Sequence, residues 1–248
     1  MLKQALRSLR RTHWAQPFFE PYYRIKANRE IKLYICEADC FFENAKKIIH
    51  IGAHRGEERY DYAKRNLHVL WIEADPKKIS DLQANLRGFQ NQRCFQGLLG
   101  SHAQSQCEFH IASNDGASSS VYPFGQHNLL WPEIEMYKKI YLPKVTLPEL
   151  LVKENIAITD YDTLIMDVQG SELDILRGIP DLPQIFTRIQ LEAADFPVYQ
   201  GSPLKMEIDE YLYKIGYIAV GVKIFRSGTG GLKNCMNCRY IRKKSSPV

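Results

Sequence analysis

Short apolar stretches alternate with amphipathic, helix-like stretches from residue 46 onward, and this alternation constrains the fold more than any other feature. KKIIHI at 46–51 is followed by EERYDYAKRN at 57–66, and HVLWIEA at 68–74 by PKKISDLQANL at 76–86. Strands that alternate with helices form a largely parallel sheet with helices on both faces. We therefore expect a doubly wound α/β domain.

The same pattern continues to residue 222. We predict further strands at 93–99, 106–112, 163–168, 185–192 and 217–222, and further helices at 147–155, 171–178 and 203–216. Thr146 and Glu149 form a capping-box pattern that opens the helix at 147. Residues 113–128 are rich in Ser, Asn and Gly, which predicts a long exposed loop, and loops of this length are often functional. We expect one domain over residues 46–248, preceded by a lead-in segment over residues 1–45.

The net charge of +5 is distributed unevenly. Residues 1–32 carry +6 and residues 223–248 carry +7, which leaves −8 on residues 33–222. An acidic body argues against a broad nucleic-acid groove, so no nucleic-acid partner is predicted. Residues 1–12 have the pattern of a short basic amphipathic helix. Two interpretations stay open for it: packing on its own domain, or weak peripheral contact with an anionic membrane or a partner.

The sequence also bears on location and on metals. No apolar run approaches the roughly 18 residues that span a bilayer, and arginines occupy the start where a signal peptide is apolar. We predict a cytoplasmic protein, with peripheral membrane contact left open. Cys235 and Cys238 have half of a zinc-site spacing, and Cys36 with Cys40 could supply the other half. Their sequence contexts differ, so no metal site is predicted.

A glycine-bearing turn, HIGAHRGE at 50–57, follows the first strand. Gly52 and Gly56 allow close approach of a ligand, although their spacing differs from the G-x-G-x-x-G of pyrophosphate sites. Glu73 ends the second strand 21 residues after Gly52. In doubly wound folds an acid at about this distance receives the hydroxyls of a bound ribose. Together these features favour a nucleoside site, the alternatives being a structural turn and a solvated acid.

Two further acids close predicted strands. Asp167 follows TLIM and Glu192 ends IFTRIQLE. Ligands in open α/β sheets sit outside the carboxyl ends of strands, so both should face the same crevice. Two close carboxylates push one pKa upward, toward that of a useful base. The alternative for Asp167 is a cap on the following helix.

An ordered set of motifs carries a family resemblance over roughly residues 46–222. These are IIHIGAHRGEE, VLWIEADP, NDGASSS, the V-T-L before a helix, YDTLIMDVQGSELDILRG and VYQGSPLKMEIDEYLYKIGY. The chain resembles the FkbM-type methyltransferases. This resemblance implies a seven-stranded, Rossmann-like class I methyltransferase fold, S-adenosylmethionine as the donor, and O-methylation of a hydroxyl on a glycan or natural product.

The resemblance also implies roles for individual residues. It places the methionine part of the donor at Gly52, Ala53, His54 and Gly56, the ribose at Glu73, and the adenine near Gly97 and Leu98. The chain departs from the family at His50, where an acid is usual, and at Pro148, where Asp is frequent.

An acceptor hydroxyl is a poor nucleophile until its proton begins to leave, so a base is expected. Asp167 is the first candidate and also a candidate donor ligand, Glu192 is the second candidate base and His54 the third. Residues 113–128 and 193–203 are expected to overhang the crevice as the acceptor pocket. A non-catalytic nucleoside-binding module and a membrane- or partner-docking scaffold stay open as alternatives.

Overall fold

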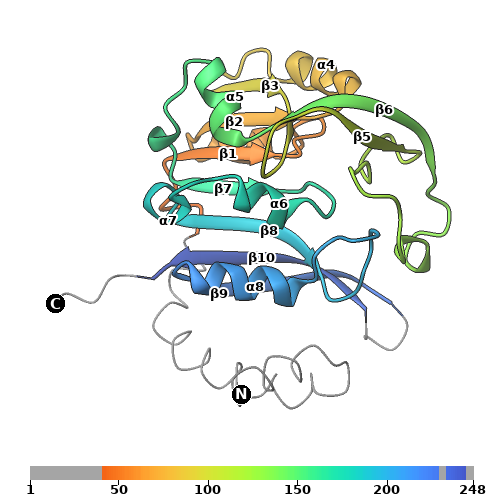
Figure 1. The fold of residues 1–248 in the computed structure, drawn as a ribbon. Coiled ribbons are helices and arrows are strands. Elements are labelled where there is room, and N and C mark those ends of the chain that lie inside the picture. Colours follow the sequence, from red (N-terminus) through yellow and green to blue (C-terminus); the bar gives the residue numbers. More distant parts are fainter. Residues whose placement is uncertain (1–40, 229–232, 244–248) are drawn as a thin grey trace, which may run out of the picture. The chain divides into compact units, whose positions relative to one another are not determined.

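The computed structural model describes residues 41–228 and 233–243, which belong to a compact unit beginning at Phe41 (Figure 1). The predicted basic helix at 1–12, and Cys36 and Cys40 of the zinc alternative, lie outside the described residues. Within the described ranges, none of the helices has the length and apolar character required to cross a membrane.

A seven-stranded sheet runs through the described unit in the order β3-β2-β1-β7-β8-β10-β9 (Figure 1). Its strands are β1 (Lys47–Ile51), β2 (His68–Glu73), β3 (Gln92–Gln96), β7 (Thr163–Met166), β8 (Arg188–Ala194), β9 (Tyr217–Ser227) and β10 (Asn234–Arg242). The pairs from β3 to β8 are parallel, and β10 runs antiparallel to both β8 and β9. The predicted doubly wound, mostly parallel α/β fold is confirmed.

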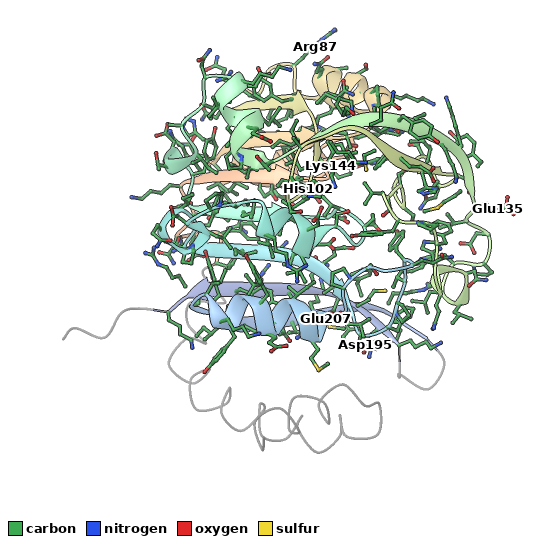
Figure 2. The ribbon with its side chains drawn as sticks, in the orientation of Figure 1. Arg87, His102, Glu135, Lys144, Asp195 and Glu207 are labelled. Carbon is green, nitrogen blue, oxygen red and sulfur yellow. The ribbon has the colours of Figure 1, made fainter. Side chains whose placement is uncertain are left out.

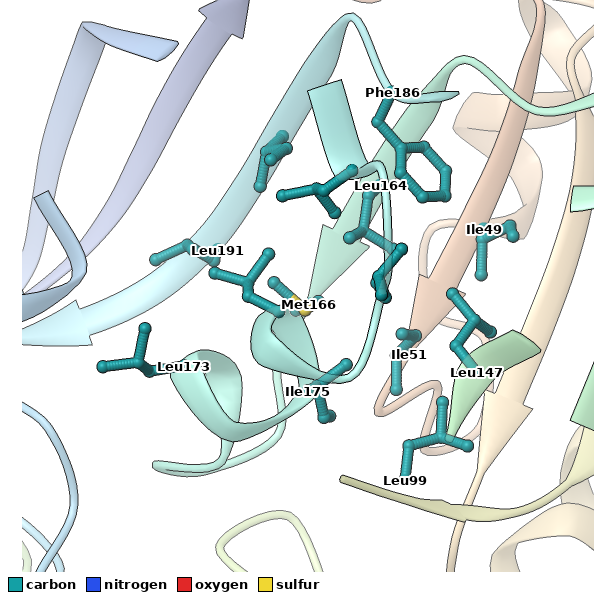
Figure 3. Packing of buried hydrophobic residues seen from close by; sticks show 14 of the residues in the cluster. Ile49, Ile51, Leu99, Leu147, Leu164, Met166, Leu173, Ile175, Phe186 and Leu191 are labelled. Atoms are coloured by element: carbon teal, nitrogen blue, oxygen red, sulfur yellow. The ribbon is translucent and has the colours of Figure 1, made fainter. Parts of the chain in front are cut away.

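Helices cover both faces because apolar residues point to both sides of the parallel strands. On one face, Ile49 and Leu164 pack with residues of α5 (Leu147–Lys153), α6 (Glu172–Arg177) and α8 (Lys205–Lys214). Figure 3 shows part of this core, with Leu147 and Leu173 beside the strand residues. On the opposite face, Ile48 and Trp71 pack with α3 (Arg59–Lys64) and α4 (Pro76–Asn85).

Shorter elements connect these layers. They are η1 (His127–Leu129), η2 (Ile158–Asp160) and α7 (Leu182–Ile185). The predicted capping box is confirmed: Thr146 Oγ1 accepts from Glu149 N, and Glu149 accepts from Thr146 N.

A second, three-stranded sheet was not predicted. It has the order β4-β6-β5 and consists of β4 (Leu98–Leu99), β5 (Gln104–Ala112) and β6 (Met136–Val145). The single strand predicted at 93–99 is therefore wrong. Gly97 N donates to Glu73 O at 2.9 Å, after which the chain leaves β2 and pairs with β6. Lys144 Nζ of β6 lies 3.7 Å from Asp174 Oδ2 of α6, an ion pair that joins this sheet to the main layer (Figure 2).

Candidate active site

A cavity of about 330 Å³ opens at the carboxyl ends of β1, β2 and β7. Its walls come from those strand ends, from β4 and β5, and from the loop at 116–121. The residues lining it include Gly52, Ala53, His54, Glu57, Glu58, Glu73, Gly97, Leu98, Phe109, Val121, Asp167 and Gln169. The structure therefore brings together the first turn, Glu73 and Asp167, which the sequence had placed at one crevice.

Gly52 allows the first turn to pass directly beneath the end of β7. Its φ of +79° lies in the left-handed region, and its N–H donates to Ile72 O at 2.9 Å. A Cβ at this position would lie 1.8 Å from Asp167 O. Only glycine permits this approach of two backbones, and the approach places the turn beside Asp167.

Glu73 is buried and held by two backbone N–H groups. His54 N donates to Oε2 at 2.7 Å, and Asp75 N donates to Oε1 at 2.8 Å. Burial raises the pKa of Glu73 although both hydrogen bonds act to lower it. Each carboxylate oxygen has a second lone pair, so this fixed group can still accept hydroxyl groups from a ligand in the cavity.

The ring of His54 contacts acceptors on both sides. Nδ1 lies 2.7 Å from Glu57 Oε1, and Nε2 lies 3.1 Å from the backbone oxygen of Asp115. A ring nitrogen that donates to such an acceptor has no lone pair for a substrate proton. This geometry favours His54 as a tether between the first turn and the loop, and it does not favour His54 as the base.

The loop predicted at 113–128 is fastened at its base and over the cavity. Ser113 N donates to Glu135 O at 2.8 Å, and Glu135 N donates to Ser113 Oγ at 3.0 Å. Asp115 pairs with the buried Lys78 at 2.6 Å and with Arg55 at 2.7 Å. Gly116, Ala117, Ser119 and Val121 then line the cavity. The loop is therefore a wall of the site.

Asp167 and Glu192 are neighbours, as the strand order had predicted. Asp167 lines the cavity, whereas Glu192 is hydrogen-bonded to Asp167 and is not among the lining residues. Burial raises the pKa of Asp167, and burial together with the Asp167 charge raises the pKa of Glu192. Glu192 therefore holds a shared proton more readily, and Asp167 is the carboxylate that faces a ligand.

Glu172 makes a third buried acid beside this pair. Its Oε1 accepts from Val168 N and Gly170 N, both at 3.3 Å, and burial raises its pKa to about 7. Glu172 is the first residue of α6, whose N-cap is Ser171, and no side chain makes a capping hydrogen bond there. The alternative in which Asp167 caps this helix is therefore wrong.

Gln169 and Tyr199 were missed as site residues by the sequence reasoning. Gln169 Nε2 lies 2.5 Å from Asp167 Oδ1, and Tyr199 OH lies 2.5 Å from Gln169 Oε1. Gln169 lies two residues after the motif acid Asp167, and Tyr199 falls within the predicted pocket segment 193–203. Their polar side chains in those motifs were the available signal.

Gly56 packs against α4 and lies outside the lining of the cavity. A Cβ there would lie 2.7 Å from Leu82 Cδ1, and Gly56 is not among the residues lining the cavity. A glycine is needed because α4 packs closely on this turn. A contact of Gly56 with the donor stays a prediction.

Comparison with known proteins then identifies the family. The sequence profile of the Methyltransferase FkbM domain matches residues 50–219. The chain belongs to the FkbM methyltransferase family. No curated protein matches the sequence.

Several solved methyltransferases are similar in structure. TrmK of M. capricolum, solved with S-adenosyl-homocysteine, shares 10% identity, with 82% of this chain and 65% of that chain covered and a TM-score of 0.47. Precorrin-6y C5,15-methyltransferase of Geobacter metallireducens shares 13%, with 80% of each chain covered and a TM-score of 0.45. Magnesium protoporphyrin IX methyltransferase of Synechocystis shares 9%, with 96% and 93% covered and a TM-score of 0.44.

The FkbM match covers the whole candidate site, since it extends from His50 past Tyr199. His50 itself lies away from the cavity: its ring stacks on Trp71 at 4.7 Å, and burial lowers its pKa to about 4. Pro148 lies in the first turn of α5. Neither departure from the family pattern removes a side chain from the cavity wall.

The remaining cysteines form no metal site in the described ranges. Cys235 and Cys238 are buried free thiols of β10. Among residues 41–228 and 233–243, no group of three or more His, Cys, Asp or Glu side chains is arranged to hold a metal ion.

Proposed function

We propose that this chain is an S-adenosylmethionine-dependent methyltransferase acting on a hydroxyl of a neutral glycan or natural product. The charge of the cavity carries the proposal. Four carboxylates line it, from Glu57, Glu58, Glu73 and Asp167, and no Lys or Arg is among its described lining residues. Such a wall favours a donor with a sulfonium and an ammonium group, and it disfavours the pyrophosphate of a dinucleotide.

The other lining groups suit the remaining parts of this donor. Glu73 would accept the ribose hydroxyls, since its carboxylate is fixed at the end of β2 by two N–H groups. Leu98, Phe109 and Val121 offer an apolar surface for the adenine. The turn that begins at Gly52 would hold the methionine part beside Asp167.

The donor supplies a methyl group already activated by its positive sulfur, so positioning does much of the work. Asp167 would accept the proton of the acceptor hydroxyl as the new O–CH₃ bond forms and the S–CH₃ bond of the donor breaks, which leaves S-adenosylhomocysteine. Glu192, behind it, keeps the shared proton and leaves Asp167 ionised. A partly buried acid in a cavity is costly for a fold, which supports a catalytic role and disfavours a passive nucleoside-binding module.

The negative charge of the cavity also bears on the chemical class of the acceptor. A phosphate- or carboxylate-bearing acceptor would be repelled by the acids around the cavity, whereas a neutral polyol would not. The wall formed by residues 116–121 supplies hydroxyl and backbone groups suited to sugar hydroxyls.

The test is methyl transfer by the full chain from tritiated S-adenosylmethionine to a panel of acceptors. We expect label on neutral oligosaccharides or polyhydroxylated macrocycles, and none on RNA or carboxylated sugars. Asp167→Asn should reduce turnover by about 10²–10⁴-fold while donor binding is retained. Label on RNA would contradict the acceptor class, and unchanged turnover in Asp167→Asn would remove Asp167 as the base.

A further inference from the structure

A chain of polar side chains leads from the loop wall to Asp167. Tyr199 is only 3% exposed, and its hydroxyl lies 2.5 Å from Gln169 Oε1 and 3.3 Å from Ser118 O. Gln169 Nε2 lies 2.5 Å from Asp167 Oδ1. This series of hydrogen-bonded side chains therefore ends on Asp167, the carboxylate that faces the cavity.

The direction of these hydrogen bonds is fixed by the chemistry of the groups. A carboxylate oxygen accepts only, so the end of the Gln169 amide that faces Asp167 must be the NH₂ group. The carbonyl end then faces the Tyr199 hydroxyl, which donates its proton. Rotating the amide by half a turn would place its oxygen against a carboxylate oxygen. Tyr199 opposes that rotation because its hydroxyl binds the carbonyl end.

The backbone of Gln169 is held in a conformation that L-residues rarely adopt. Its φ is +54°, and Ser120 Oγ donates to its carbonyl oxygen at 2.7 Å. A non-glycine residue in this region is strained, and such residues cluster at functional sites. The loop wall thus holds Gln169 in the position from which its amide contacts Asp167.

We infer that Gln169 and Tyr199 are positioning residues for the base. Gln169 binds Asp167 Oδ1 through its amide NH₂ group, and Tyr199 determines which end of the amide faces the base. This inference rests on the proposed function, because the proton that Asp167 receives is that of the acceptor.

The arrangement has a consequence for ionisation. An N–H donated to a carboxylate favours its charged form, so Gln169 lowers the pKa of Asp167, against the larger effect of burial. The other titratable groups that act on Asp167 are Glu192 of β8, Glu172 of α6, Glu58 just before α3, His54 of the first turn, and Tyr199 itself. Removing the Gln169 donor should therefore raise the pKa of Asp167 further while those groups stay in place.

The experiment is carboxyl ¹³C NMR of the full chain labelled at aspartate, titrated with acid and base. The resonance that disappears in Asp167→Asn identifies the base. We expect Gln169→Leu to raise the pKa of Asp167 by about one unit and Tyr199→Phe to raise it by a smaller amount. Tyr211→Phe is the control, since its hydroxyl contacts Leu176 O at 3.4 Å.

An unchanged Asp167 titration in folded Gln169→Leu and Tyr199→Phe would overturn the inference. If Gln169→Leu does not fold, Tyr199→Phe decides, because it removes a single oxygen. A shift equal to that of Tyr211→Phe would also overturn it. Failure of the proposed function is recognised separately: unmutated protein would not bind S-adenosylhomocysteine in calorimetry, whatever the titration shows.

Discussion

Gly52→Ala perturbs the closest backbone approach at the site. The new Cβ would lie 1.8 Å from Asp167 O and 2.6 Å from Asp167 C, at a φ of +79°. Neither strand can yield easily, because β1 and β7 are paired from Ile48↔Thr163 to Ile51↔Met166. The left-handed φ costs about 1–2 kcal/mol, and an overpacked contact adds about 1–3 kcal/mol. The total of about 2–5 kcal/mol is a large part of the 5–15 kcal/mol typical of a whole domain.

Gly201→Ala is the matched control for this substitution. Gly201 has a φ of +81°, and a Cβ there would meet nothing within 4 Å. It should show the conformational cost alone, about 1–2 kcal/mol. Urea unfolding followed by circular dichroism measures both variants. If Gly52→Ala destabilises the protein no more than Gly201→Ala does, the close approach of Gly52 to Asp167 is refuted.

Three further predictions concern a buried acid, the loop wall and the basic start of the chain. Burial raises the pKa of Glu172 to about 7 in the folded protein. The stability that this acid contributes in its protonated form is therefore fully present below pH 4.5, its ordinary pKa, and is lost as the pH rises to 7 and above. Glu172→Gln should therefore gain stability relative to the unmutated protein over this pH range, by at most about 3 kcal/mol, in thermal unfolding at several pH values; a pH-independent difference would contradict this. Lys78→Met leaves Asp115 without its buried partner, so proteolysis within residues 113–128 should become faster than in the exposed-site control Lys77→Met, and equal rates would count against the tether. Deleting residues 1–12 should leave the calorimetric affinity for S-adenosylmethionine unchanged, and loss of affinity with the fold intact would place that segment in the site.

The framework of the fold was predictable because burial on both faces gives parallel strands nearly continuous apolar sequences. Strands β6 and β10 were not predicted because their sequences are not continuously apolar. MYKKIYLPKV has one face exposed and carries three lysines and a proline. In NCMNCRYIR two asparagines and two arginines interrupt the apolar residues, although the strand lies inside the sheet. Such strands form because they pair with strands that are far away in the sequence. The local pattern of apolar residues carries no information about that pairing.

The candidate site divides in the same way. The proximity of Asp167 and Glu192 follows from strand order alone, and the structure confirms it. The contact of Gln169 with Tyr199 spans 30 residues and depends on a left-handed φ and on how the loop folds back. Gly56 shows why a glycine in a turn is hard to interpret from sequence. A glycine required for close packing against Leu82 gives the same sequence pattern as a glycine required beside a ligand.

Calorimetric titration of the full chain with S-adenosylmethionine, and in parallel with NAD⁺, distinguishes a methyl-donor site from a dinucleotide site. The acid-lined cavity predicts one site for S-adenosylmethionine and no detectable heat from NAD⁺. Glu73→Ala should weaken the S-adenosylmethionine site by about 1–3 kcal/mol, because ribose hydroxyls would lose their buried acceptor. Comparable binding of NAD⁺, or no binding of S-adenosylmethionine by the unmutated protein, would contradict the account.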